Sequence, residues 1–160
     1  MANQPPITGV SEVVLNVMDL PKMRDFYMRV MGFPLHGEVS LETPEADPDG
    51  EPTITFLTVC QTDTPLSRGG HPQLLALIDF RRHVYAKARV TGHDVSRSTL
   101  NHLAFEIPPE SFEEHVARFG ELGIEVAFSE FPAMQARAMF FQDPEGNALE
   151  LICHHIPEAK

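Results

Sequence analysis

One order of predicted elements occurs twice along this chain. An apolar strand near residues 11–17 is followed by an amphipathic helix over 19–32 and three more strands; a strand at 100–107 is followed by a helix over 109–123 and again three strands. The later strands are predicted at residues 35–43, 53–61, 74–80, 124–129, 136–142 and 148–154. The repeat predicts an α+β fold of two tandem βαβββ modules that form a curved mixed sheet around a central cleft.

Both helices carry start and stop signals. Asp19 suits the N-cap of the first helix, and Gly32 suits the position just after its end. Ser111 with Glu114 predicts a capping box for the second helix, and Gly123 is expected to end it. The boundaries of both helices are therefore predicted from local chemistry.

The last two strands are separated by a short turn, Asp-Pro-Glu-Gly-Asn at residues 143–147. Pro144 presets φ for a turn, Asp143 can accept a hydrogen bond from the backbone two residues on, and Gly146 tolerates a positive φ. These residues predict a hairpin whose second strand runs through residues 148–154.

That second strand is apolar on both faces except at Glu150. A buried carboxylate is costly unless it is paired, protonated or bound to a metal. Superposing the two predicted modules places Glu12 over His102, at the head of each first strand, and Ala76 over Glu150, in each fourth strand. Strand alternation then directs Glu12, His102 and Glu150 into one cavity, where they are candidate metal ligands.

Other interpretations stay open for the same residues. Glu150 could accept hydrogen bonds from the backbone or from an arginine such as Arg137. His102 could be a histidine of the core, and Glu12 could be a general base beside a site with two ligands. His71, at the end of a loop, could be solvated or could line the cleft.

Length and charge limit the classes of protein. We interpret residues 1–160 as a single domain, with a first module at about 9–80, a connector at about 81–98 and a second module at about 99–155. The net charge of −11 argues against nucleic acid as a partner. No apolar run approaches the ~20 residues of a spanning helix, so no membrane partner and a cytoplasmic location are predicted. Cys60 and Cys153 are interpreted as buried free thiols.

Three motifs together carry a resemblance to a known family. They are Asn101-His-Leu-Ala-Phe-Glu106, the 143–147 turn followed by Leu149-Glu-Leu151, and Asp19-Leu-Pro with Phe26-Tyr and Met31-Gly-Phe33. On these motifs the chain, from about residue 9 to Cys153, resembles the vicinal oxygen chelate superfamily of glyoxalases, fosfomycin-resistance and bleomycin-resistance proteins and extradiol dioxygenases. The stretch around Gly70-His71 and the following strand resembles the extradiol dioxygenase-like branch.

The resemblance implies a metal site. His102 and Glu150 match ligand positions of the family, and Glu12 stands where the family usually has histidine. The implied cofactor is a divalent ion, Fe(II), Mn(II), Zn(II) or Ni(II). Because two carboxylates and one imidazole make a harder set than two imidazoles and one carboxylate, Mn(II), Mg(II), Zn(II) and Ni(II) fit at least as well as oxygen-activating Fe(II). Glu12 and His71 are the residues expected to be catalytic.

The function implied is that of a metal-dependent enzyme on a small-molecule substrate with vicinal oxygens. The reaction would be glyoxalase-like or dioxygenase-like, with catechol-type ring cleavage among the candidates, because a bound cation can chelate two adjacent oxygens. The alternative is a metal-free ligand-binding or sequestration protein of the bleomycin-resistance type. A homodimer is also expected from the family.

Overall fold

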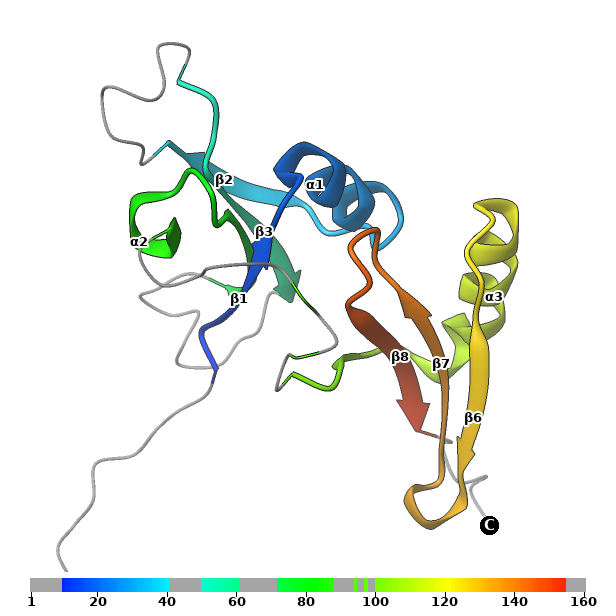
Figure 1. The fold of residues 1–160 in the computed structure, drawn as a ribbon. Coiled ribbons are helices and arrows are strands. Elements are labelled where there is room, and N and C mark those ends of the chain that lie inside the picture. Colours follow the sequence, from blue (N-terminus) through cyan, green and yellow to red (C-terminus); the bar gives the residue numbers. More distant parts are fainter. Residues whose placement is uncertain are drawn as a thin grey trace, which may run out of the picture. The chain divides into compact units, whose positions relative to one another are not determined.

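The computed structural model describes residues 10–40, 50–60, 72–87, 94, 97 and 100–154. The chain divides into two compact units, Met1–His93 and Asp94–Lys160. Each unit has a four-stranded mixed sheet, and the strands and main helix follow the order β-α-β-β-β, so the predicted α+β fold of two tandem modules is confirmed (Figure 1). That the units form a single domain stays a prediction. His71 lies outside the described residues. Among the described helices, none is long and apolar enough to cross a membrane.

The first unit contains β1 (Glu12–Val17), α1 (Leu20–Arg29), β2 (Leu35–Val39), β3 (Ile54–Cys60), β4 (Gln73–Asp79) and the short α2 (Val84–Lys87). Its strand order is β1-β4-β3-β2; β1 runs parallel to β4, and the other neighbours are antiparallel. Helix α1 packs against β3 and β4. Strand β4 is buried almost throughout, as its continuous apolar sequence predicts.

The ends of α1 follow the signals in its sequence. A carboxylate oxygen of Asp19 accepts a hydrogen bond from the backbone amide of Lys22 at 3.0 Å, which confirms the predicted N-cap. Gly32, just beyond the helix, has a φ of 75°, a conformation that glycine adopts without a steric penalty. The buried side of the helix is formed by residues at helical spacing, namely Leu20, Met23, Phe26 and Tyr27.

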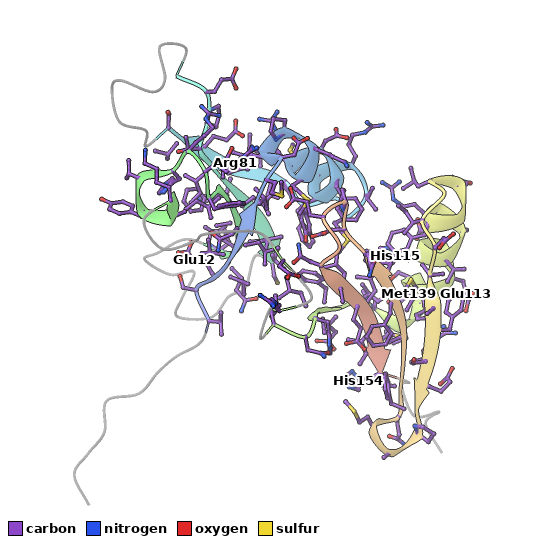
Figure 2. The ribbon with its side chains drawn as sticks, in the orientation of Figure 1. Glu12, Arg81, Glu113, His115, Met139 and His154 are labelled. Carbon is purple, nitrogen blue, oxygen red and sulfur yellow. The ribbon has the colours of Figure 1, made fainter. Side chains whose placement is uncertain are left out.

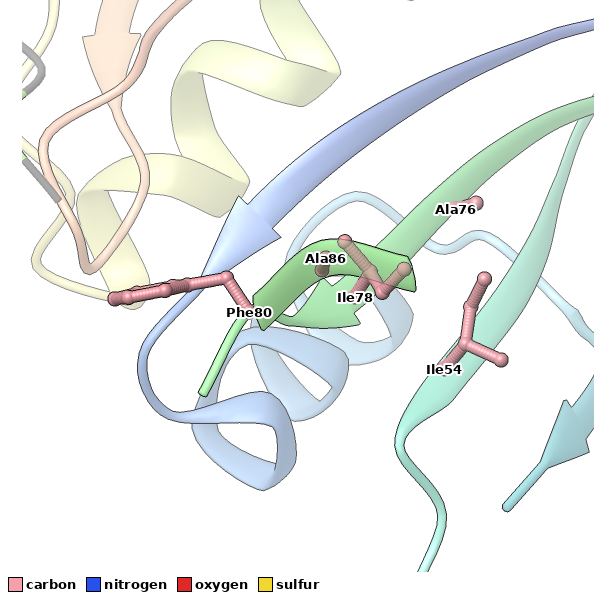
Figure 3. Close-up of a cluster of buried hydrophobic side chains, with 5 residues drawn as sticks. All are labelled: Ile54, Ala76, Ile78, Phe80 and Ala86. Carbon is pink, nitrogen blue, oxygen red and sulfur yellow. The ribbon is translucent and has the colours of Figure 1, made fainter. Parts of the chain in front are cut away.

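Helix α2 lies in the segment predicted to be a connector, at about residues 81–98. Its Ala86 is 5% exposed and joins a buried apolar cluster with side chains from β3, β4 and the residue after β4 (Figure 3). The other members of this cluster are Ile54, Ala76, Ile78 and Phe80. The beginning of the connector is therefore part of the core of the first unit.

The second unit contains β5 (Leu103–Glu106), α3 (Phe112–Glu121), β6 (Ala127–Phe131), β7 (Ala136–Gln142) and β8 (Ala148–His154). Its strand order, β5-β8-β7-β6, repeats that of the first unit, with β5 parallel to β8. Strands β5 and β6 each begin three residues later than predicted. Helix α3 packs on one face of the sheet, where the ring centroids of Phe119 and Phe141 are 4.8 Å apart.

Two further predictions, the capping box at Ser111 and the burial of Cys60, are wrong. Ser111 makes no capping bond; a 3-10 turn precedes α3, and the Ser111 hydroxyl donates to the carbonyl of Pro108 at 2.8 Å instead. Cys153 is buried and free as predicted, but Cys60 is exposed and free. Cys60 is the last residue of β3 and follows a register shift after Thr58, so its side chain escapes the alternation of the strand.

The predicted turn at residues 143–147 is confirmed. One carboxylate oxygen of Asp143 accepts hydrogen bonds from the backbone amides of Glu145 (3.0 Å) and Asn147 (2.9 Å), and the other accepts one from the Asn147 side chain (2.8 Å). Gly146 has a φ of 88°. Because Asp143 is only 4% exposed, these bonds are shielded from water, and they set where β8 begins.

Replacing Asp143 tests the contribution of this turn. Asp143→Ala leaves two backbone amides without their acceptor and should lower the free energy of unfolding by about 2–3 kcal/mol. Asp143→Asn keeps an acceptor for those amides and should recover part of the loss. Urea denaturation of the three proteins measures both effects; equal midpoints for wild type and Asp143→Ala would show that the turn does not depend on this carboxylate.

His83 is a buried histidine at the start of α2. Its Nδ1 accepts a hydrogen bond from the backbone amide of Tyr85 at 3.3 Å, so the ring proton is on Nε2, which is buried and finds no acceptor among the described residues. The side chain is 3% exposed, and burial lowers the pKa of His83 below its ordinary value of 6.5. The folded state therefore holds this ring neutral.

This burial predicts a loss of stability in mild acid. A histidine pKa that is lower in the folded state means that the unfolded chain binds the extra proton first. The contribution of neutral His83 is present above pH 6.5 and is lost as the pH falls through 6.5 toward the lowered pKa, at no more than about 1.4 kcal/mol per pH unit. His83→Gln should flatten the dependence of urea midpoints between about pH 7 and pH 5. His36→Gln, which removes an exposed imidazole from β2, is the matched control, and the flattening by His83→Gln should exceed the effect of this variant.

Candidate metal-binding site

Glu150 lies in the middle of β8, on the sheet face opposite α3. Its neighbours in the backbone register are Ala104 of β5 and Phe140 of β7. Since Phe141 and its partner Leu149 face the helix, alternation directs Phe140 and Glu150 to the other face. Glu150 is 4% exposed, so its carboxylate is buried between two apolar neighbours. A carboxylate in these surroundings requires a partner.

That partner is His102. The distance between His102 Nε2 and Glu150 Oε2 is 3.1 Å. On the other side of the imidazole, Nδ1 lies 2.6 Å from Oδ1 of Asn101. The rings of His102 and Phe140 are in a T-shaped arrangement, with ring centroids 5.7 Å apart and an interplanar angle of 79°. The structure thus brings together two of the three predicted ligands, within one unit.

The alternative prediction, that Glu150 accepts a hydrogen bond from Arg137, is wrong. Arg137 lies on the α3 face of the sheet, because it is one residue out of phase with Ala138 and Phe140. Its guanidinium lies over the ring of Phe112, 3.9 Å from the centroid, and donates to Glu113 at 2.8 Å.

A second pair of histidine and glutamate lies further along the same sheet face. Glu106 of β5 and His154 at the end of β8 (labelled in Figure 2) approach to 3.8 Å. Their side chains are 79% and 50% exposed. Exposed pairs at this separation contribute little energy, so this pair differs from the His102–Glu150 contact, in which the carboxylate is buried.

Glu12 lies at the head of β1 in the first unit and is exposed (Figure 2). The register supports the correspondence between the two modules: Val14 pairs with Ala76, as Ala104 pairs with Glu150. Glu12 and His102 each precede those paired residues by two. The correspondence makes Glu12 the counterpart of His102, while its participation in a shared site stays a prediction.

The donor atoms of His102 and Glu150 fit a divalent metal. Two donors about 2.1 Å from one ion and at right angles to each other lie about 3.0 Å apart, close to the distance observed here. An imidazole nitrogen and a carboxylate oxygen suit Mn(II), Zn(II), Fe(II) and Ni(II). Within the part of the chain that the structure describes, no group of three or more His, Cys, Asp or Glu side chains could hold a metal.

The sequence comparison decides the family. Residues 9–151 match the profile of the family described as the glyoxalase/bleomycin resistance protein/dioxygenase superfamily. The chain belongs to this superfamily. Its members in this description include glyoxalases and dioxygenases, which are enzymes, and a resistance protein. No curated protein matched the sequence.

Solved structures share the fold of this superfamily member. Fosfomycin resistance protein FosX from Listeria monocytogenes, as a mutant in complex with Mn(II) and dihydroxypropylphosphonic acid, is 19% identical with a TM-score of 0.63, over 94% of this chain and 95% of that one. Lactoylglutathione lyase from Agrobacterium tumefaciens is 21% identical with a TM-score of 0.57, over 93% and 96%. A glyoxalase/dioxygenase from Nostoc punctiforme is 22% identical with a TM-score of 0.59, over 98% and 100%.

Two contacts of the site were not predicted from the sequence. Phe140 could have been found by counting back from the turn at residues 143–147, which sets the pairing of β7 with β8. No pattern in the sequence indicated the contact between Asn101 and His102. Consecutive residues of a strand point to opposite faces, and this contact arises because both residues precede the regular part of β5.

The pairing of a buried carboxylate with a partly exposed imidazole predicts unequal effects of their removal. In metal-free protein, His102→Leu leaves the Glu150 carboxylate buried without a partner and should lower the free energy of unfolding by about 1–3 kcal/mol. Glu150→Leu should cost less, because the His102 side chain is 35% exposed and can bond to water.

The double variant separates this explanation from a loss of packing. His102→Leu combined with Glu150→Leu should be more stable than His102→Leu alone, as measured by urea denaturation in EDTA. Additive losses would mean that the two side chains do not interact.

Proposed function

We propose that this chain is a metal-dependent enzyme that acts on a small substrate with vicinal oxygens. The observation that carries the proposal is the 3.1 Å contact between His102 Nε2 and Glu150 Oε2, with Glu150 4% exposed between apolar neighbours. A buried carboxylate paired with a partly exposed imidazole is suited to hold a cation that is reached from solvent.

The relatives support the metal and the substrate class. FosX was solved with Mn(II) and with a compound whose name describes a dihydroxypropyl group, and another relative is a lactoylglutathione lyase. For this chain we propose a divalent ion and a small oxygenated substrate.

Glu12 is the proposed third ligand. It is the counterpart of His102 in the first module, and its side chain is exposed rather than held by the core of its own unit. With Glu12, His102 and Glu150 the site would have one nitrogen donor and two carboxylates, which favours Mn(II) among the candidate ions. His71 stays a proposed catalytic residue, and the homodimer and the cytoplasmic location stay predictions.

The metal would act as a Lewis acid toward negative charge that develops on the substrate oxygens. The chain's own residues have separate tasks. His102 and Glu150 would hold the ion, and the ring of Phe140 packs in a T-shaped arrangement with the imidazole. Glu12 or Glu150 would move a proton through an oxygen that does not bind the metal.

Metal content tests the site. Protein purified without chelator and reconstituted with Mn(II), Fe(II), Zn(II) or Ni(II) should bind about one ion per chain, measured by elemental analysis after gel filtration. Glu150→Ala and His102→Ala should lose it, because each removes a donor. Glu106→Gln is the matched control, since it removes an exposed carboxylate from the same sheet face, and it should retain the metal.

Turnover tests the reaction class. The metal-loaded protein should act on the hemithioacetal of methylglyoxal and glutathione, on a catechol or on fosfomycin, and Glu150→Ala should abolish that activity with the fold retained by circular dichroism. Failure to bind any of the four ions, together with uptake of a hydrophobic ligand, would support the sequestration protein instead.

A further inference from the structure

The contact between Asn101 and His102 determines which ring nitrogen carries the proton. His102 Nδ1 lies 2.6 Å from Oδ1 of Asn101. A carboxamide oxygen can only accept a hydrogen bond, so Nδ1 must be the donor. Neutral His102 then has its proton on Nδ1 and a lone pair on Nε2.

This tautomer has a consequence at Glu150. The lone pair on Nε2 is directed at Oε2 of Glu150, itself an acceptor, at 3.1 Å. Two acceptors at this distance attract each other only through a proton or a metal ion that lies between them, and a metal ligand must have exchanged that proton for the ion. In the opposite tautomer, with the proton on Nε2, His102 would donate directly to Glu150, and Nε2 would be blocked as a metal ligand.

The orientation of the His102 ring must be fixed by a further contact, whereas the sheet already fixes the position of Glu150. Glu150 is in the middle of β8 and is paired on both sides, whereas His102 precedes β5 and is outside its backbone ladder. Its side chain is 35% exposed, so one side of the imidazole has room to rotate. The edge contact with Phe140 limits the tilt of the ring but does not distinguish its two nitrogens.

We infer that Asn101 is a positioning residue that holds His102 as the Nδ1–H tautomer and directs Nε2 to the metal. The inference rests on the proposed function, because it gives His102 Nε2 the role of a metal ligand. A hydrogen bond to the far nitrogen of a ligating imidazole sets both its orientation and its basicity.

Metal affinity is the first readout. Dissociation constants for Mn(II) and Zn(II) are measured by competition with a chelating dye. Asn101→Ala should weaken binding about 10- to 100-fold. Asn101→Asp keeps the acceptor and should bind at least as tightly as wild type. Gln135→Ala, which removes an amide from the β6–β7 turn at the other end of the sheet, is the matched control and should leave the affinity unchanged.

The imidazole tautomer is the second readout, and it does not depend on activity. Proton–nitrogen correlation spectra of protein labelled with ¹⁵N-histidine distinguish the two ring nitrogens, and His102→Gln assigns the signal among the eight histidines. Metal-free wild type should show a proton on Nδ1, and Zn(II) should shift the Nε2 signal. Asn101→Ala should move the proton toward Nε2.

The outcomes separate this inference from the proposed function. Wild type that binds no metal overturns both. Wild type that binds metal while Asn101→Ala binds it with the same affinity, or a metal-loaded wild type with the proton on Nε2, overturns the role of Asn101 alone.

Discussion

The backbone pairing of β8 with β5 and β7 decides where Glu150 lies, and the candidate site depends on it. A shift of one residue in either register would turn Glu150 toward α3. In the observed register its neighbours are Ala104 and Phe140, neither of which can compensate a charge, and its polar contact in the described part of the chain is with His102. The turn at residues 143–147 holds this register through hydrogen bonds to a buried carboxylate. The site therefore depends on backbone and turn geometry before it depends on its own side chains.

The two modules use the same backbone frame for different purposes. Ala76 occupies in the first module the place of Glu150 in the second, and it is buried in an apolar cluster that includes Ala86 of α2. The first module has no carboxylate at this place in β4, and Glu12 is its one predicted ligand. Repetition of the fold supplies matching positions, and the side chains at those positions decide which of them can bind an ion.

The same side chains, Glu150 and His102, affect both the stability of the fold and the proposed metal binding. The burial that makes the carboxylate of Glu150 costly without a partner also strengthens its attraction to a cation. The orientation of His102 is less constrained by the sheet, which is why a neighbouring side chain is needed to direct its nitrogen. A site of this kind combines one ligand held by the sheet with one held by a side-chain hydrogen bond.

The sequence by itself determined the order of elements, the ends of α1, the turn before β8 and the strand phase of His102 and Glu150, because periodicity, capping and turn chemistry are local. Only the tertiary structure decided that His102 and Glu150 are in contact, that Arg137 is on the other face, and that α2 belongs to the core. It also decided that Asn101 bonds to the ring of His102. These features depend on register and on contacts between distant segments, which residue spacing along the chain does not encode.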